Sequence, residues 1–175
     1  GNAVGDLIEA FQSVKDSRKP VVVHINTLKG KGYAPAEQNK EVWHYNGPFH
    51  IETGEPLYEM TEEDYSDISL NYLLDKMKKD PAVVAITSGT PTVMGFTEDK
   101  RKEAGKQFVD VGIAEETAVA LASGIAANGG KPVYGVYSTF VQRTYDQIAQ
   151  DLCINNSPAT IVTFCGSVYG MNDVT

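Results

Sequence analysis

Hydrophobic residues occur along this chain in two patterns, one with helical spacing and one of short continuous runs. The first pattern predicts a helix over 4–14, with its apolar side chains on one face. After Pro20, an apolar and β-branched run at 21–27 predicts a buried strand. A helix followed by a buried strand is half of a parallel α/β unit, so we expect this part of the chain to contribute to a parallel sheet.

The same alternation returns in the second part of the chain. Helical spacing predicts helices at 65–79, from Glu115 to about 127, and at 138–152, with a polar and partly helical stretch at 97–106. Continuous apolar runs predict strands at 82–87, 108–111, 131–137 and 159–164. This order predicts an α/β fold in which a parallel sheet is flanked by helices on both faces.

Between these two parts lies a long stretch with neither pattern, at 34–58. It carries several prolines and glycines and the only tryptophan of the chain, Trp43. A stretch of this length without periodicity is more often a functional loop or a linker than part of a compact core. We therefore expect a second unit to start near Thr61.

Charge and composition exclude several classes of protein. The formal net charge of the 175 residues is −8, which argues against non-specific binding of nucleic acid, because such binding requires clustered lysine and arginine. No apolar run reaches the roughly 18 residues of a membrane-spanning helix, and no signal peptide is visible. Cys153 and Cys165 form no metal or redox motif, so we expect reduced thiols and a cytoplasmic location.

Glu115 is the first candidate for chemistry. The strand predicted at 108–111 feeds through Gly112 into a helix, and such a junction faces the carboxyl edge of a sheet, where open α/β sheets bind their ligands. One interpretation is that acids in a first helical turn only complement the helix dipole, by roughly 0.3–1 kcal/mol each. The other is that Glu115 is a working carboxylate in an apolar pocket. The segment alone leaves both open.

Other candidates follow the remaining strand ends and the long loop. Lys29 lies in a Lys-Gly-Lys-Gly loop, which suits either a diphosphate or a solvated basic turn. His44 is flanked by aromatic residues that could orient it, although a loop histidine is usually only solvated. Tyr137, Phe140 and Arg143 follow the strand at 131–137, where they suit an anionic ligand or, equally, core packing and a surface ion pair.

Several of these stretches together resemble a known family. They are VVVHINTLKGKGYAPAE, WHYNGPFHIETG, FVDVGIAEETAVALASGIA, GGKPVYGVYSTFVQRTYDQIAQDL and, more weakly, VYGMNDVT. The family is the transketolase class of thiamine-diphosphate enzymes, within which the 1-deoxy-D-xylulose-5-phosphate synthases are most similar. The resemblance implies a thiamine-diphosphate-binding fold and a fragment of a multi-domain enzyme. Residues 1–33 would end a diphosphate-binding domain, 34–60 would be a loop or linker, and 61–175 would form an incomplete pyrimidine-binding domain.

The resemblance also implies roles for single residues. Glu115 would be catalytic, because it matches the acid that hydrogen-bonds the aminopyrimidine ring of the cofactor. Phe140 would stack on that ring, and Lys29 would reach the diphosphate. His44 would be a second catalytic residue, facing the substrate.

Substrate binding is implied for the strand end near residue 137. Tyr137 and Arg143 would hold the acceptor, with Arg143 suited by charge and geometry to a phosphate or carboxylate.

The implied reaction is a carboligation. Pyruvate would lose carbon dioxide, and its remaining carbons would join glyceraldehyde 3-phosphate to give 1-deoxy-D-xylulose 5-phosphate, a precursor for isoprenoid and thiamine biosynthesis. The partners would be these small molecules and a second copy of the chain in a homodimer, with no nucleic acid and no membrane. The implied cofactors are thiamine diphosphate and Mg²⁺. Because the metal ligands of the family would lie outside this chain, we expect the chain alone to bind the cofactor poorly and to be inactive.

Two stretches depart from the family pattern. The family has Gln-His after the glutamate, where this chain has Glu116 and Thr117. At the last predicted strand end the family has Asp-Arg-Ala-Gly, whose arginine is expected to bind the acceptor phosphate, whereas 164–167 reads Phe-Cys-Gly-Ser. This loss leaves two alternatives to the synthase: a transketolase-like paralogue with a different acceptor, and a non-catalytic assembly module.

Overall fold

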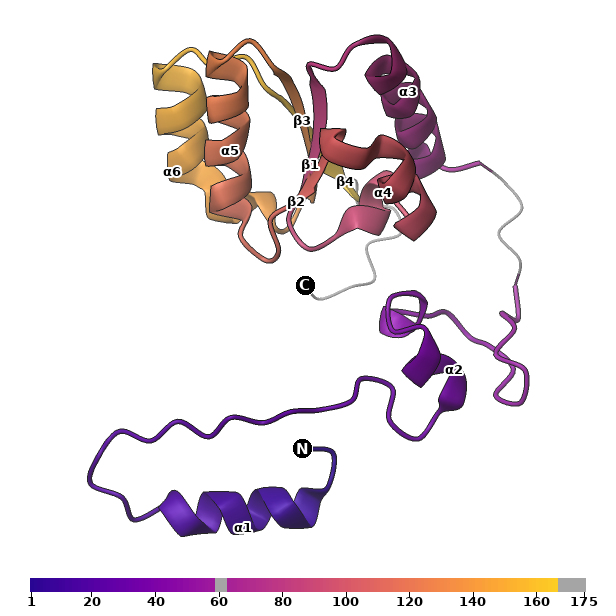
Figure 1. The fold of residues 1–175 in the computed structure, drawn as a ribbon, viewed down its shortest axis with the longest axis vertical. Helices are drawn as coiled ribbons and strands as arrows, with labels where there is room; N and C mark the ends of the chain where they lie inside the picture. The colour runs from indigo at the N-terminus through magenta and orange to yellow at the C-terminus, as the bar shows by residue number, and fades with distance from the viewer. Residues whose placement is uncertain (59–62, 167–175) are drawn as a thin grey trace. The chain divides into compact units, whose positions relative to one another are not determined.

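The computed structural model describes residues 1–58 and 63–166 (Figure 1). The weakly matching stretch 168–175 lies outside the described residues. The chain divides into two compact units, Gly1–Thr61 and Glu62–Thr175, and each is described by itself.

The first unit contains helices and loops. α1 (Val4–Val14) confirms the predicted helix. The stretch predicted to lack secondary structure contains α2 (Ala34–Gln38) and a 3₁₀ turn, η1 (Val42–His44). Within it, Trp43 packs edge-on against Phe49, with ring centroids 4.8 Å apart. Aromatic packing therefore orders a stretch whose sequence shows no periodicity.

The prediction of a strand at 21–27 is wrong. These residues are extended but pair with no strand among the described residues of the first unit, and Val22 is 92% exposed. A strand is stabilised by hydrogen bonds to a neighbouring strand, and an apolar β-branched run alone supplies no such partner.

The second unit is built on a parallel sheet with the strand order β2-β1-β3-β4. Its strands are β1 (Val83–Thr87), β2 (Phe108–Asp110), β3 (Lys131–Tyr137) and β4 (Thr160–Phe164). β1 pairs in parallel with both β2 and β3, with Thr87 opposite Asp110 on one side and opposite Gly135 on the other. The strands therefore end along one carboxyl edge, and the loops that leave this edge are close neighbours.

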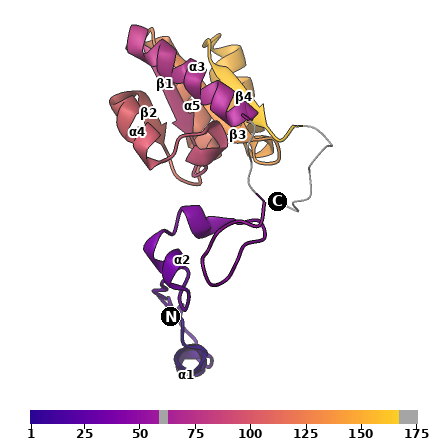
Figure 2. The same ribbon diagram turned by 90° about the vertical axis from the view of Figure 1, so that its right-hand side faces the viewer.

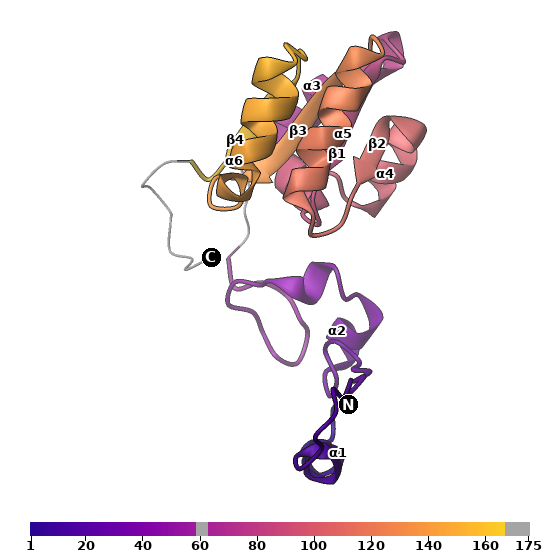
Figure 3. The same cartoon turned by 90° about the vertical axis from the view of Figure 1, so that its left-hand side faces the viewer.

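Helices cover both faces of this sheet (Figure 1). α3 (Tyr65–Lys79) and α4 (Glu98–Ala104) lie on one face, with the 3₁₀ turns η2 (Pro91–Met94) and η3 (Gly105–Gln107) (Figure 2). α5 (Glu115–Ala127) and α6 (Tyr145–Gln147) lie on the other (Figure 3). Each face has its own apolar cluster, one around Leu73 and Phe96 and one around Val119 and Tyr134. The predicted parallel sheet with helices on both faces is confirmed.

The helix predicted at 138–152 differs in detail. It begins later, as the 3₁₀ turn η4 (Val141–Thr144), continues through α6, and ends as a π-helix, η5 (Ile148–Ile154). Ser138 does not cap it. The backbone N–H of Ser138 donates to the Phe164 carbonyl, and its hydroxyl donates to the Cys165 carbonyl at 2.9 Å, so this residue ties the end of β3 to β4.

Candidate active site

Glu115 is the first residue of α5, and only 2% of it is exposed. Gly112 precedes it with a φ of 73°, which lets the chain turn sharply between β2 and α5. Nη1 of Arg143, in η4, lies 3.3 Å from Oε2 of Glu115 and donates a hydrogen bond to it. A buried carboxylate is costly unless it is paired, and Arg143 supplies the opposite charge here.

Arg143 itself is accessible, since 55% of its side chain is exposed. A guanidinium group carries five N–H donors, so the bond to Glu115 leaves others for a ligand. The sequence also allowed Arg143 to pair with Asp146 in the same predicted helix, but among the described residues its ion pair is with Glu115. The sequence left the partner of Arg143 open, and the fold supplies Glu115, 28 residues away.

Tyr137 and Phe140 form an aromatic pair at the end of β3. Their ring centroids are 5.6 Å apart and their planes are at 83°. Phe140 is partly buried against the apolar cluster beneath α5, and η4, which follows it, packs against α5. Phe140 therefore contacts the core and stays partly accessible at the carboxyl edge, so its role as a ligand contact remains a prediction.

A buried polar pair lies under this edge. The hydroxyl of Tyr134 is 2.8 Å from Oγ of Ser88, and both side chains are almost fully buried. Burial raises the pKa of Tyr134 to about 12; the hydrogen bond with Ser88 opposes this rise, and the charges of Glu115 and Glu116 add to it. Tyr134 is therefore a neutral group within the electrostatic influence of Glu115.

Lys29 and His44 lie together in the first unit. The Lys29 ammonium donates a hydrogen bond to Nδ1 of His44, and both residues belong to exposed parts of that unit. Gly30 and Gly32 have φ values of 80° and 99°, which only glycine adopts readily, so the Lys-Gly-Lys-Gly loop is tightly turned. The predicted site residues thus form two groups: Lys29 with His44 in one unit, and Glu115 with Tyr137, Phe140 and Arg143 in the other.

Sequence reasoning missed three polar residues at this edge: Asp110, Ser88 and Tyr134. Asp110 accepts hydrogen bonds from the loops after β1 and β2. A charged residue that ends an apolar strand was the available signal for Asp110. Ser88 and Tyr134 are 46 residues apart, and no sequence signal pairs them.

Glu115 and Phe140 fit the pyrimidine part of thiamine diphosphate better than they fit a metal. A buried carboxylate can hold a proton against a ring nitrogen, and the partly exposed Phe140 offers a flat apolar face. In the described part of the chain, no group of three or more His, Cys, Asp or Glu side chains is placed to hold a metal ion.

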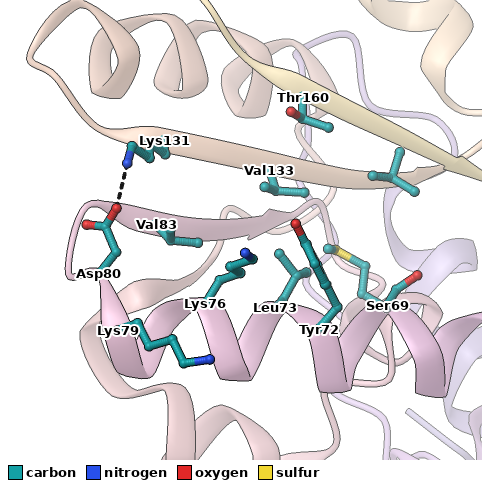
Figure 4. A pocket seen from close by; sticks show the side chains of 12 residues that line it. Ser69, Tyr72, Leu73, Lys76, Lys79, Asp80, Val83, Lys131, Val133 and Thr160 are labelled. Carbon is teal, nitrogen blue, oxygen red and sulfur yellow. Dashed lines mark hydrogen bonds and ion pairs between the residues drawn. The ribbon is translucent and has the colours of Figure 1, made fainter.

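A cavity of about 670 Å³ lies elsewhere in the second unit, between α3 and the sheet (Figure 4). It opens near the starts of β3 and β4, and its rim carries the ion pair between Lys131 Nζ and Asp80 Oδ2, at 2.7 Å. Open α/β sheets bind ligands at the carboxyl ends of their strands. We therefore place the candidate site at Glu115 rather than in this cavity.

The sequence of this chain is similar to those of known proteins. The family described as transketolase, pyrimidine binding domain, matches residues 62–173. The 1-deoxy-D-xylulose-5-phosphate synthase of Halothermothrix orenii is 39% identical over 175 residues, which cover 100% of this chain and 27% of that protein. The synthase of Natranaerobius thermophilus is 43% identical over 171 residues, covering 97% of this chain and 27% of that protein.

The chain therefore spans about a quarter of the length of these relatives. A solved structure described as a split gene transketolase, inactive beta4 tetramer, is 20% identical, with a TM-score of 0.46, and the match covers 56% of this chain and 33% of that chain. The sequence similarities confirm the resemblance predicted from the motifs. Among the described residues, no helix combines the length and the apolar composition that crossing a membrane requires.

Proposed function

Because this chain belongs to the family of transketolase pyrimidine-binding domains, we propose that it contributes Glu115 to a thiamine-diphosphate site. The proposed enzyme condenses pyruvate with glyceraldehyde 3-phosphate to form 1-deoxy-D-xylulose 5-phosphate. The observation that carries the proposal is the almost complete burial of Glu115 at the carboxyl edge of the sheet, where a surface acid in a first helical turn would be exposed. The relatives named as this synthase support the reaction.

Glu115 acts as the acid that holds a proton against the pyrimidine ring. When bound, thiamine diphosphate supplies a nucleophilic thiazolium carbon and a positively charged ring that accepts electrons. The side chain of Glu115 shares its proton with a ring nitrogen, and its burial keeps water from competing for that hydrogen bond. Phe140 provides an apolar face for the ring.

Arg143 has two tasks in this proposal. Its bond to Oε2 orients the Glu115 carboxylate, and its exposed N–H groups bind the phosphate of the acceptor or the carboxylate of pyruvate. Tyr137 stands beside Phe140 and helps Arg143 to hold the acceptor. In the first unit, Lys29 binds the diphosphate and His44, its hydrogen-bond partner, faces the substrate as the second catalytic residue.

The remaining parts of the proposal concern the whole protein. We propose a cytoplasmic homodimer that requires Mg²⁺ and serves isoprenoid and thiamine biosynthesis. The names of the relatives support the reaction. As the resemblance implies, the ligands for Mg²⁺ would lie outside this chain.

A second candidate function is a transketolase-like paralogue with a different acceptor. The observation that favours it is the end of β4, where Phe164 is followed by Cys165 and Gly166 and no arginine is present. Loss of a phosphate-binding arginine would weaken the binding of a phosphorylated acceptor by roughly 1.5–3 kcal/mol, the usual contribution of a hydrogen bond to a charged group. A non-catalytic assembly module is the third alternative.

The test is product formation by the full-length protein with thiamine diphosphate, Mg²⁺ and pyruvate, with and without glyceraldehyde 3-phosphate. We expect 1-deoxy-D-xylulose 5-phosphate, and we expect Glu115→Ala to lower kcat by roughly 10²–10⁴-fold, the usual contribution of a general acid or base. Glu116→Ala is the matched control, because Glu116 lies in the same helical turn but is exposed.

The outcomes separate the alternatives. Pyruvate consumption without the deoxyxylulose product would favour the paralogue, and a screen of acceptor aldehydes would follow. An unchanged rate in Glu115→Ala would contradict the catalytic role and favour the assembly module.

A further inference from the structure

Asp110, the last residue of β2, joins two loops at the carboxyl edge. Its Oδ2 accepts a hydrogen bond from the hydroxyl of Thr87 at 2.7 Å. Its Oδ1 accepts from the backbone N–H of Gly112 at 2.7 Å and from that of Gly89 at 3.2 Å. One carboxylate therefore holds both the loop that follows β1 and the turn that follows β2.

The two loops are also in close contact. Gly89 has a φ of 79°, and a Cβ atom there would lie 3.2 Å from Cγ1 of Ile113 and 3.4 Å from the carbonyl carbon of Gly112. The ladder between the strands extends up to this point, because the N–H of Val111 donates to the Thr87 carbonyl at 3.0 Å. Little space remains for either loop to shift toward the other.

The loop after β1 is fixed from its other side as well. Ser88 is 1% exposed, and its hydroxyl is bonded to Tyr134 in β3. β1 lies between β2 and β3 in the sheet. The segment 87–89 is thus a fixed base, against which Asp110 can hold the turn that follows β2.

The turn in question leads directly to Glu115. The N–H of Ala114 donates to the Gly112 carbonyl at 2.7 Å, so the turn is a single hydrogen-bonded unit, and α5 begins at the next residue. A residue that fixes the position of Gly112 therefore fixes the start of α5 and the backbone of Glu115.

We propose that Asp110 is a positioning residue for Glu115. It acts by clamping the turn at Gly112 to the end of β1, so that the carboxylate of Glu115 meets Arg143 and the ligand in one orientation. The value of this clamp for catalysis rests on the proposed function, but the clamp itself is a property of this chain and is tested without any cofactor.

The test is backbone amide hydrogen exchange of the full chain, measured by NMR. In Asp110→Ala, we expect the Gly112 amide to exchange about tenfold faster or more, because it loses a hydrogen bond to a charged acceptor. We also expect the resonances of the Glu115 amide and the Arg143 guanidinium to shift. Protection in α3 and β4 should not change, since the clamp hydrogen bonds involve neither element.

Two further variants control the result. Asp110→Asn should restore most of the protection, because an amide oxygen still accepts from both backbone N–H groups and the Thr87 hydroxyl can accept from the amide NH₂. Asp99→Ala is the matched control. The Asp99 side chain is 92% exposed, and its ion pair with Lys102 is long, at 3.6 Å. This variant should leave the exchange of Gly112 unchanged.

Several outcomes would overturn the proposal. Unchanged exchange of Gly112 in Asp110→Ala, equal changes in Asp99→Ala, or a uniform loss of protection over the whole unit would each do so. Failure of Asp110→Asn to restore protection would also contradict a role based on hydrogen bonds. If Asp110→Ala speeds the exchange of Gly112 but Glu115→Ala stays fully active, the proposed function fails and the clamp stands. If Glu115→Ala loses activity but Asp110→Ala leaves the exchange of Gly112 unchanged, only the clamp is contradicted.

Discussion

At the scale of single residues, the fold changes the ionisation of Tyr134 strongly. The side chain is fully buried in β3, and burial raises its pKa from 10.0 to about 12, against the opposing effect of the Ser88 hydrogen bond. The folded protein therefore holds the phenolic proton more tightly than the unfolded chain does. At neutral pH the Tyr134 hydroxyl is neutral, so it adds no second negative charge near Glu115.

This difference predicts a dependence of stability on pH. Because the folded pKa lies above the unfolded one, the contribution of Tyr134 is fully present below pH 10 and is lost as the pH rises through about 12. The expected total is about 2–3 kcal/mol of unfolding free energy, since each pKa unit corresponds to ~1.4 kcal/mol.

The measurement is urea unfolding of wild type and Tyr134→Phe between pH 8 and 11.5. At pH 8, Tyr134→Phe should cost about 1 kcal/mol, because the Ser88 hydroxyl loses its partner. The difference between the two proteins should shrink and then reverse above pH 10. Parallel curves over the whole range would contradict the raised pKa.

At the scale of elements, a glycine in β3 allows η2 to pack closely against the sheet. Gly135 faces Met94 of η2, which is fully buried on the same face of the sheet as α3. A Cβ atom at position 135 would overlap the Met94 side chain. The absence of a side chain at Gly135 is therefore what lets η2 pack directly on the centre of the sheet.

Two glycine substitutions test this packing. We expect Gly135→Ala to destabilise the protein by about 1–3 kcal/mol, because the buried Met94 cannot move without disturbing its neighbours. Gly124→Ala is the matched control. Position 124 is in the exposed part of α5, and a Cβ atom there would have no neighbouring atom within 4 Å, so alanine should stabilise by about 0.5–1 kcal/mol. Thermal unfolding gives both values, and equal effects of the two changes would contradict the packing.

At the scale of the whole molecule, the two units differ in their cores. Both apolar clusters belong to the second unit, whereas Ala36 is the only buried apolar residue among the described residues of the first. The second unit carries Glu115 and Arg143, while Lys29 and His44 belong to the first. Among the described residues of either unit, no three or more His, Cys, Asp or Glu side chains are placed to hold a metal ion together.

This division predicts weak cofactor binding by the chain on its own. We expect isothermal titration of the 175-residue chain with thiamine diphosphate to give a Kd no tighter than about 1 mM (about −4 kcal/mol), since Glu115, Phe140 and Lys29 would act without the metal ligands that the family places outside this chain. Adding Mg²⁺ should change little, because the resemblance implies metal ligands outside this chain. Micromolar binding that depends on Mg²⁺ would contradict this prediction and show that the chain completes the site itself.

The sequence by itself determined the elements whose stability is local. α1 and α3 span the residues that helical spacing predicted, and α3 is fixed further by the capping box of Asp64 and Asp67. The strands of the second unit were readable as continuous apolar runs, and their alternation with helices fixed a parallel sheet. Glu115 stood out because a strand leads directly into its helix, and local pattern places such a junction at the carboxyl edge.

Tertiary structure decided everything that depends on residues distant in sequence. The run at 21–27 has the composition of a strand but no neighbour to pair with among the described residues of its unit. The burial of Glu115, its ion pair with Arg143, and the Asp110 clamp each join different loops of the sheet edge. Hydrogen bonds and ion pairs act over only a few ångströms, so which groups meet depends on strand order and register, and neither is written in local periodicity.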